Sequence, residues 1–215
     1  MSNHSLSINA IKLADYVSSL EDFHIYKRTG AGYNHMGAVI TDTILQAGLN
    51  YSTVVLPRVQ TLIQRWPSAC NTSIFSSLIN RFGIKEVICW KDDEKPRRIE
   101  CLTDFFIKQH VETELDCRQW LTVENNLDSL RQVRGIGPKS VDYLKSLVGV
   151  PAVAVDRHVR TFVSWAGLTL FEYEDIRQVV CEAAEILGHG YCDLDHAIWQ
   201  YVSTSSSSTT LKSAA

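Results

Sequence analysis

Apolar residues recur every three or four positions along most of the chain, and no stretch alternates strictly between apolar and polar residues. The first spacing is typical of amphipathic helices, whereas strict alternation would indicate strands. We therefore expect an all-α fold. One helix is expected near the start, where Ile8, Ile11, Leu13 and Val17 lie partly on one face. The others are expected over 36–49, 53–66, 72–82, 84–90, the segment after Pro96, a short stretch ending near Val133, 138–149, 154–166, 173–187 and 193–203.

Individual residues predict several helix boundaries. Gly83 can end the helix before it, because glycine readily adopts the left-handed conformation of a C-cap. Pro57 either lies near the start of its helix or kinks it. The run KDDEKPRR at 91–98 is expected to be a charged turn, and Asn125 or Asn126 is a candidate N-cap for the short helix that follows.

The composition favours a folded chain without a membrane partner. The chain has 215 residues, 45% of them hydrophobic, so it can bury one core or two small ones. No apolar run approaches the ~20 residues that span a bilayer, and the start lacks the layout of a secretory signal. The six cysteines include no Cys-x-x-Cys pair, so we expect them to be reduced and mostly buried in a cytosolic protein.

The formal net charge of −3 argues weakly against nucleic acid as a partner. The charge is unevenly distributed, however: residues 131–160 hold six basic and two acidic residues, a local net charge of +4. A concentrated positive patch is what phosphate binding requires. A solvated basic face would have the same composition.

The segment 130–147, LRQVRGIGPKSVDYLKSL, predicts a helical hairpin. A helix ends near Val133, a tight Gly-Ile-Gly turn follows, and a second helix begins at Pro138, where the missing N–H costs nothing. Gly135 and Gly137 permit a positive φ or a crowded backbone in the turn. The free N–H groups of the turn and of the helix start form an anion site, and in DNA the anion is phosphate.

This stretch resembles the helix-hairpin-helix DNA-binding motif, which joins two helices through a Gly-hydrophobic-Gly turn. Similar GIGPK turns occur in nucleases, ligases and polymerases, where the lysine contacts phosphate. The next segment, 148–168, places Asp156 between an apolar run and the start of a helix. It is similar to the segment that follows the hairpin in the endonuclease III family, where an aspartate in this setting is catalytic and the hairpin carries a lysine at the position of Lys139.

The resemblance implies that Lys139 and Asp156 are catalytic. The carboxylate would stabilise the electron-poor sugar carbon of a flipped-out nucleotide as the glycosidic bond breaks, and the lysine amine would attack that carbon to form a Schiff base. The first turn of a helix would favour the neutral amine. Two simpler interpretations stay open: Asp156 caps the following helix, and Lys139 contacts phosphate.

The resemblance also implies a partner and a domain organisation. The partner would be double-stranded DNA containing a damaged base, bound by a monomer in the cytoplasm (nucleoid) or the nucleus. Residues 30–150 would form a helical barrel lobe that ends in the hairpin, residues 1–29 and 151–203 a terminal lobe, and residues 204–215 a disordered tail. The DNA-contacting residues would be Arg134, Gly135, Ile136, Gly137, Ser140, Arg157 and His158.

The chain departs from the family near the C-terminus. Many relatives hold an iron–sulfur cluster there with four cysteines, whereas this chain has only Cys181 and Cys192 in that region, so no such cluster and no other cofactor is expected. The segment 189–196 groups His189, Cys192, Asp193, Asp195 and His196. Packing of the last helix explains this segment better than a metal site does, so we expect no metal.

Two family features have no clear equivalent. The glutamine that fills the gap left by the flipped base could correspond to Gln46 or to Asn50. A tryptophan could stack on a base, although each is more typical of a core. The tryptophans are Trp66, Trp90, Trp120, Trp165 and Trp199.

The sequence thus predicts a DNA glycosylase that removes a damaged base, with a lyase step through Lys139. The lysine favours oxidised bases, because the alkylated-base and mismatched-adenine branches of this superfamily generally lack it. One alternative is a non-catalytic helix-hairpin-helix module that recruits a partner to DNA. The other is a monofunctional glycosylase in which Lys139 touches phosphate only.

Overall fold

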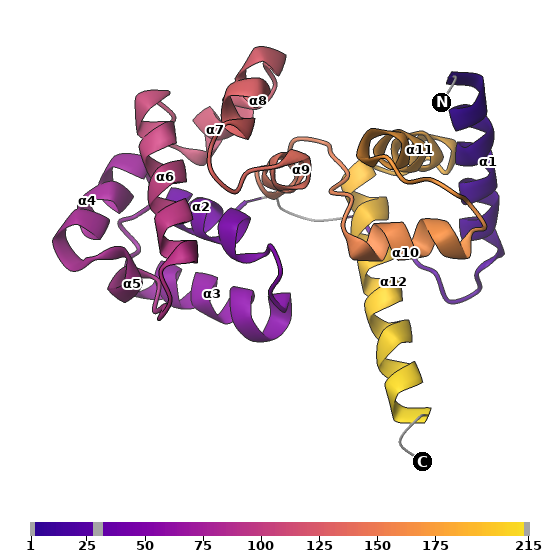
Figure 1. Cartoon of the computed structure of the whole chain (residues 1–215), viewed down its shortest axis with the longest axis horizontal. Helices are drawn as coiled ribbons and strands as arrows, with labels where there is room; N and C mark the ends of the chain where they lie inside the picture. Colours follow the sequence, from indigo (N-terminus) through magenta and orange to yellow (C-terminus); the bar gives the residue numbers. More distant parts are fainter. Residues whose placement is uncertain (1–2, 28–31, 213–215) are drawn as a thin grey trace. The chain divides into compact units, whose positions relative to one another are not determined.

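The computed structural model describes the backbone of residues 3–27 and 32–212 and the side chains of residues 5–27 and 32–205. Within these ranges every regular element is helical (Figure 1). The predicted all-α class is therefore confirmed for the described residues. No helix in this part of the chain combines the length and the apolar character needed to cross a membrane.

The chain divides into two compact units. Unit 1 comprises Met1–Thr29 and Pro151–Ala215, and unit 2 comprises Gly30–Val150. Each unit buries its own hydrophobic cluster. The chain begins in unit 1, builds unit 2 as a continuous insertion and then returns to unit 1.

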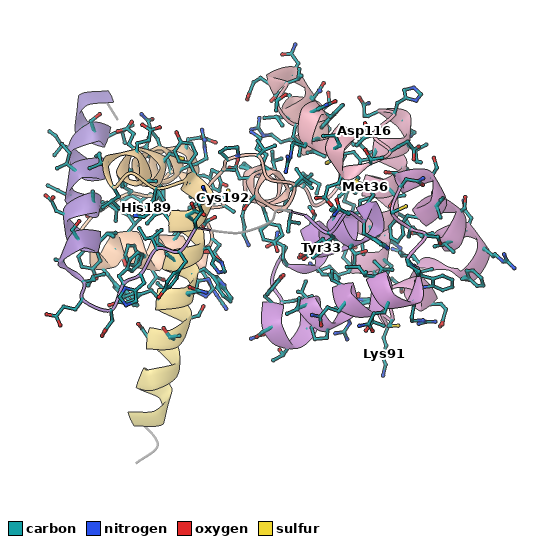
Figure 2. The ribbon with its side chains drawn as sticks, turned by 180° about the vertical axis from the view of Figure 1, so that it is seen from behind. Tyr33, Met36, Lys91, Asp116, His189 and Cys192 are labelled. Carbon is teal, nitrogen blue, oxygen red and sulfur yellow. The ribbon has the colours of Figure 1, made fainter. Side chains whose placement is uncertain are left out.

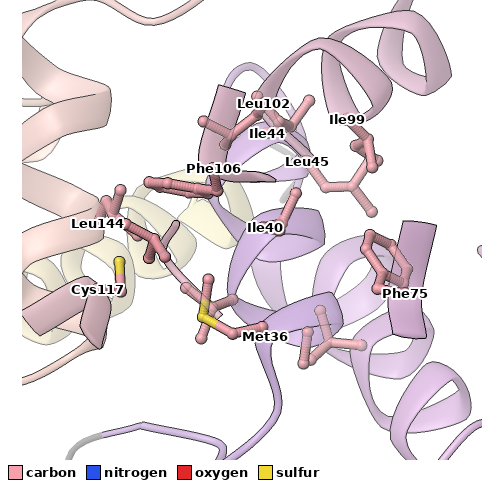
Figure 3. Packing of buried hydrophobic residues seen from close by; sticks show 14 of the residues in the cluster. Met36, Ile40, Ile44, Leu45, Phe75, Ile99, Leu102, Phe106, Cys117 and Leu144 are labelled. Carbon is pink, nitrogen blue, oxygen red and sulfur yellow. The ribbon is translucent and has the colours of Figure 1, made fainter. Parts of the chain in front are cut away.

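Unit 2 is organised around one buried helix, α2. All ten residues of α2 are buried, and helices α3, α4, α6 and α9 pack on it. Figure 3 shows side chains of α2, such as Ile40 and Ile44, among those of α6 and Leu144 of α9. The elements of unit 2 are α2 (Met36–Leu45), the π-helical turn η1 (Tyr51–Val55), α3 (Leu56–Arg65), α4 (Thr72–Phe82), α5 (Ile84–Val87), α6 (Glu94–Lys108), α7 (Glu114–Trp120), α8 (Glu124–Arg131) and α9 (Pro138–Leu147).

Unit 1 consists of α1 (Asn3–Ser19), α10 (Arg157–Trp165), α11 (Tyr173–Ile186) and α12 (Tyr191–Lys212). Helix α1 packs on α11, and α10 packs on α12. The expected buried stripe of α1 is only half correct, since Ile8 and Ile11 are exposed. A helix turns by about 100° per residue, which places these two isoleucines away from the buried face. That face carries Leu6, Ala10, Leu13, Ala14 and Val17.

Some predicted boundaries are confirmed and others are wrong. Helix α4 covers the predicted range, and Gly83 follows it with a φ of +82°. The segment 91–98 is not a turn, because α6 begins at Glu94. Pro96 falls within the first turn of α6, where the N–H that proline lacks would have no intrahelical partner.

The region before the hairpin contains a helix that the periodicity did not predict. Helix α7 begins with a capping box in which Thr113 and Asp116 each accept a hydrogen bond from the backbone N–H of the other. Neither Asn125 nor Asn126 caps α8, because the N-cap position belongs to Val123. Asn126 instead donates through Nδ2 to the Trp120 carbonyl at 2.9 Å.

Helix α12 continues past residue 203 to Lys212, so residues 204–212, which the composition assigned to the tail, are helical. Thr204 Oγ1 and Ser205 Oγ donate to the carbonyls of Gln200 and Tyr201, one turn earlier. Serine and threonine hydroxyls can make their hydrogen bonds within a helix in this way. A segment rich in these residues is therefore compatible with a helix. The last three predicted tail residues, 213–215, lie outside the described residues.

The cysteines are free thiols, but the expectation that most are buried is wrong. Only Cys117 is buried, and Cys181 and Cys192 are half-buried. The remaining three, Cys70, Cys89 and Cys101, are exposed. Cys70 and Cys89 lie in turns and Cys101 lies on the exposed face of α6, and one cysteine carries too little apolar area for its residue type alone to decide its burial.

Candidate nucleic-acid interface

A tight turn joins α8 to α9, as the sequence predicted. Gly135 in this turn has a φ of +84°. The side chain of Ile136 is buried, and its N–H donates to the Val133 carbonyl at 3.0 Å. The apolar residue of the turn therefore anchors the loop on the core of unit 2 and leaves the backbone of the flanking glycines toward the surface.

The two glycines of the turn have different roles. A Cβ on Gly135 would lie 2.6 Å from Cδ of Arg98, whereas a Cβ on Gly137 would meet nothing within 4 Å. Gly137 also has a φ of −110° and a ψ of −177°, which is extended backbone open to any residue. The expected positive φ or crowded backbone is therefore found at Gly135 but not at Gly137.

We expect Gly135→Ser to lower the free energy of unfolding by about 1–3 kcal/mol, because the positive φ is strained for serine and Arg98 must move. Gly137→Ser is the matched control: it should be neutral or stabilising by up to about 1 kcal/mol, since serine is a favourable N-cap. Urea unfolding followed by circular dichroism measures both. Equal losses in the two variants would contradict this account of the turn.

The start of α9 is open to an anion. Gly137 is its N-cap, no side chain caps the helix, and Pro138 occupies the first turn. The N–H groups of a first helical turn have no intrahelical partners and attract anions. Ser140, an expected DNA contact, is only 7% exposed. Its backbone N–H, in the first turn, is therefore better placed than its hydroxyl to reach a ligand.

Lys139 lies in the first turn of α9, and its Nζ donates to Gln46 Oε1 at 2.9 Å. Gln46 is the C-cap of α2. One turn along each helix, Tyr143 OH donates to Asp42 Oδ1 at 3.0 Å. These two pairs, 46 with 139 and 42 with 143, show that α2 and α9 run antiparallel. The amine of Lys139 therefore lies near the C-terminal end of α2 as well as near the N-terminal end of α9. Only the second of these helix ends could be expected from the sequence.

The two residues considered for filling the gap of a flipped base are now distinguished. Asn50 is the N-cap of η1, where its Oδ1 accepts a hydrogen bond from the Thr53 N–H at 3.0 Å. Gln46, in contrast, contacts Lys139. Of the two, only Gln46 lies beside a candidate catalytic group.

A buried carboxyl group lies next to this pair and was not found by sequence reasoning. Asp42 is fully buried, and its Oδ2 accepts a hydrogen bond from Tyr33 OH at 2.6 Å; Figure 2 labels Tyr33. Burial raises the pKa of Asp42 to about 6, although the hydrogen bonds from Tyr33 and Tyr143 act in the opposite direction. Burial and then the charge of Asp42 raise the pKa of both tyrosines. A lone aspartate in an otherwise apolar and hydroxyl-bearing helix was the available signal.

We expect the free energy of unfolding to fall as the pH rises from about 4 to about 6. Over this interval folded Asp42 keeps a proton that the unfolded chain has lost, because its folded pKa of about 6 lies above its ordinary value. The contribution should be about 2–3 kcal/mol. Asp42→Asn should remove this slope, and Asp104→Asn, at an exposed position, should keep it. Urea titrations at four pH values provide the measurement, and a slope that persists in Asp42→Asn would contradict the assignment.

The start of α6 brings further charges to the hairpin. Glu94 accepts a hydrogen bond from Arg98 Nε at 2.8 Å and one from Arg134 NH2 at 3.0 Å. The predicted DNA contact Arg134 is therefore held by a carboxylate, although its side chain remains 64% exposed. Lys95 donates from Nζ to the carbonyls of Ile44 and Ala47, both at 2.7 Å.

The basic window counted from the sequence is divided between the two units. Four of its six basic residues belong to unit 2, and the other two, Arg157 and Arg160, belong to unit 1. Arg131 is paired with Asp128 at 2.8 Å, and Arg160 donates to the Phe171 carbonyl at 2.8 Å. The net charge of +4 over residues 131–160 therefore does not describe the charge of a single surface.

Asp156 caps α10. Its Oδ1 accepts hydrogen bonds from the N–H groups of His158 and Val159 at 2.7 and 3.0 Å, and its Oδ2 lies 2.8 Å from His158 Nδ1. The carboxylate keeps 21% of its side-chain surface exposed. The capping interpretation is thus correct, and it also fixes the orientation of the carboxylate. Arg157, beside it, is exposed.

The residues considered for a metal have other contacts. Asp195 Oδ2 accepts a hydrogen bond from the Ala154 N–H at 3.0 Å, and the ring of His196 stacks on Trp199 with centroids 5.8 Å apart. Figure 2 labels His189 and Cys192, which flank the start of α12. Among the described residues, no group of three or more histidine, cysteine, aspartate and glutamate side chains is arranged to hold a metal ion.

The tryptophans are mostly parts of the cores. Trp66, Trp90 and Trp120 pack against the hydrophobic cluster of unit 2. In unit 1, Trp199 is half-buried with its ring edge-on to His158, at a centroid distance of 6.4 Å. Trp165 is 43% exposed, whereas the other four tryptophans are half-buried.

Together these features define an all-helical protein of two compact units, with an uncapped helix start beside a lysine in one unit and a helix-capping aspartate in the other. Residues 91–203 match the family model of a domain of unknown function, DUF8548. The match covers more than half of the chain, and the chain belongs to this family. No curated protein and no solved structure matches the chain.

Proposed function

We propose that the protein is a DNA glycosylase that excises a damaged, oxidised base from duplex DNA and then acts as a lyase through Lys139. The observation that carries the proposal is the hairpin between α8 and α9. It combines an uncapped helix start, a suitable site for a DNA phosphate, with a lysine amine in the same helical turn. Units 1 and 2 would be the terminal and barrel lobes of a helix-hairpin-helix glycosylase.

DNA binding would rest on phosphate contacts of the hairpin. The backbone at Gly135, Ile136 and Gly137 would face the phosphate, and Arg134 would exchange Glu94 for it. Ser140 would contribute its backbone N–H. In unit 1, Arg157 and His158 would add contacts from the start of α10. Such contacts position the protein but carry little sequence information, so binding should be strongly salt-dependent and insensitive to sequence.

The chemistry divides between two side chains. As the bond between C1′ and the base breaks, its electron pair stays with the base, which takes up a proton from water, and the Asp156 carboxylate offsets the positive charge that develops on the sugar. The neutral amine of Lys139 bonds to C1′ and gives up its two protons, one to the ring oxygen as the sugar opens and one to the hydroxide left by that water, which yields an imine. Loss of a proton from C2′ then expels the 3′ phosphate. The capped geometry of Asp156 supports its part, because two backbone N–H groups hold the carboxylate in one orientation.

One alternative has specific support. Both oxygens of Asp156 are engaged by α10 and His158, and the Lys139 amine contacts Gln46. A non-catalytic DNA-binding module needs nothing more from either residue. It predicts tight binding of duplex DNA without base release.

A panel of duplexes, each with one oxidised base, separates these functions. The duplexes are incubated with excess protein and scored for released base, for strand cleavage and for a covalent adduct after borohydride reduction. The proposed function predicts all three products with at least one lesion. Base release without an adduct would assign a monofunctional glycosylase, and binding without any product would assign the non-catalytic module.

A further inference from the structure

Two lysine amines are fixed at the C-terminal end of α2, although they come from different helices. Lys95 of α6 donates to the backbone carbonyls of Ile44 and Ala47, both at 2.7 Å. Lys139 of α9 donates to the side chain of Gln46 at 2.9 Å. All three acceptors belong to residues 44–47, which form the end of α2 and the turn that follows it.

Burial and two hydrogen bonds fix the position of the Lys95 side chain. The side chain is half-buried, and its ammonium group donates to a carbonyl in the last turn of α2, where carbonyls lack helical partners, and to a carbonyl in the turn that follows. Burial and, after it, the positive charges of Arg98 and Lys139 lower the pKa of Lys95 to about 8, although the negative charges of Asp92 and Glu94 act in the opposite direction. Near pH 7 Lys95 is therefore still mostly protonated.

We propose that Lys95 is a positioning residue for the amine of Lys139: it holds a second positive charge at the same helix end and thereby favours the neutral, nucleophilic form of Lys139. This inference rests on the proposed function. Electrostatic coupling between two groups is reciprocal, so the interaction by which Lys139 acts on Lys95 also acts in the other direction. A neighbouring cation is an established means of activating a lysine nucleophile.

Lys95 also counteracts an effect that opposes catalysis. The carbonyl groups at the end of α2 and the amide oxygen of Gln46 would both stabilise a protonated Lys139. Because Lys95 occupies the carbonyls of Ile44 and Ala47 itself, it removes two of these acceptors from Lys139 and replaces them with a cation. The hydrogen bond to Gln46 Oε1 helps to orient the amine.

The test is the pH profile of adduct formation by full-length protein with a duplex that contains an abasic site, under borohydride and from pH 6 to 10. Lys95→Gln should move the midpoint upward by about one pH unit, so that the rate near pH 7 falls roughly tenfold while the rate at high pH recovers. Lys95→Arg keeps the charge and should keep the midpoint. Lys108→Gln is the matched control, because it removes one exposed lysine from the other end of α6.

A second measurement does not depend on activity. Reductive ¹³C-methylation labels the lysines, and the resonance of Lys139 is assigned as the one that Lys139→Gln removes. Its pH titration is then followed by NMR in the unsubstituted protein and in Lys95→Gln. The proposal predicts that the Lys139 titration moves upward in Lys95→Gln. An unchanged titration and pH profile would overturn the role of Lys95 while leaving the proposed function intact.

Failure of the proposed lyase function and failure of the role of Lys95 give different results. Absence of any adduct in the unsubstituted protein would refute the lyase function, whatever the NMR titration shows. An adduct that Lys95→Gln abolishes at every pH and that Lys139→Gln retains would make Lys95 the nucleophile and overturn both assignments. Thermal melting of each variant separates these outcomes from loss of the fold.

Discussion

Lys139→Gln should abolish the borohydride-trapped adduct with abasic or damaged DNA, a loss of at least a hundredfold, while duplex binding changes by less than about threefold. The amide that replaces the amine can still donate to Gln46 Oε1, the observed partner of Lys139 at 2.9 Å. It cannot form a Schiff base, because an amide nitrogen is not a nucleophile at neutral pH. Gel-based adduct yields and fluorescence anisotropy at fixed salt measure the two properties.

Lys145→Gln is the control for this substitution, since Lys145 lies in the last turn of the same helix. It should leave the adduct unchanged. An undiminished adduct in Lys139→Gln would remove Lys139 from the chemistry. Loss of binding together with the adduct would instead favour the interpretation in which Lys139 contacts phosphate only.

Asp156→Asn should reduce single-turnover base release by a hundredfold or more while the melting temperature stays nearly constant. Asparagine ranks with aspartate as an N-cap, so its Oδ1 can still accept from the N–H groups of His158 and Val159. It carries no charge, however, and cannot offset the positive charge that develops on the sugar. Such transition-state stabilisation is typically worth several kcal/mol.

Asp156→Ala complements this test of the two roles of Asp156, the N-cap of α10 and the negative charge beside the sugar. It removes the cap as well as the charge and should also lower the free energy of unfolding by about 1–2 kcal/mol. Base release at the native rate in a normally melting Asp156→Asn would show that Asp156 serves α10 only.

The fold class and most helices could be predicted from the sequence because their apolar spacing is regular. Helix α4 and the C-cap glycine after it are examples. The prediction failed for segments with no apolar periodicity of their own. The start of α6 lies in a run of charged residues, and the buried residues Ile99, Leu102 and Phe106 come only later in the helix. Helix α7 is only seven residues long, too short to show a periodicity, and its capping box was the available signal.

The local parts of the candidate site could be predicted from the sequence, but the contacts between residues far apart in the sequence could not. The hairpin and the aspartate follow local rules for turns and caps, so their sequence is sufficient. The contacts of Lys139 with Gln46, of Tyr143 with Asp42 and of Lys95 with the end of α2 join residues far apart in the sequence. A single sequence contains no signal for which polar residues of two antiparallel helices face each other.

The central claim is tested most directly by locating the covalent adduct. The unsubstituted protein is trapped on abasic duplex with borohydride, digested with nuclease and trypsin, and analysed by mass spectrometry. A modified lysine resists trypsin, so the account predicts a nucleotide remnant on an uncleaved fragment spanning residues 135–145, with the mass addition on Lys139. A remnant on the fragment 92–97, which contains Lys95, or the absence of any modified fragment, would contradict it.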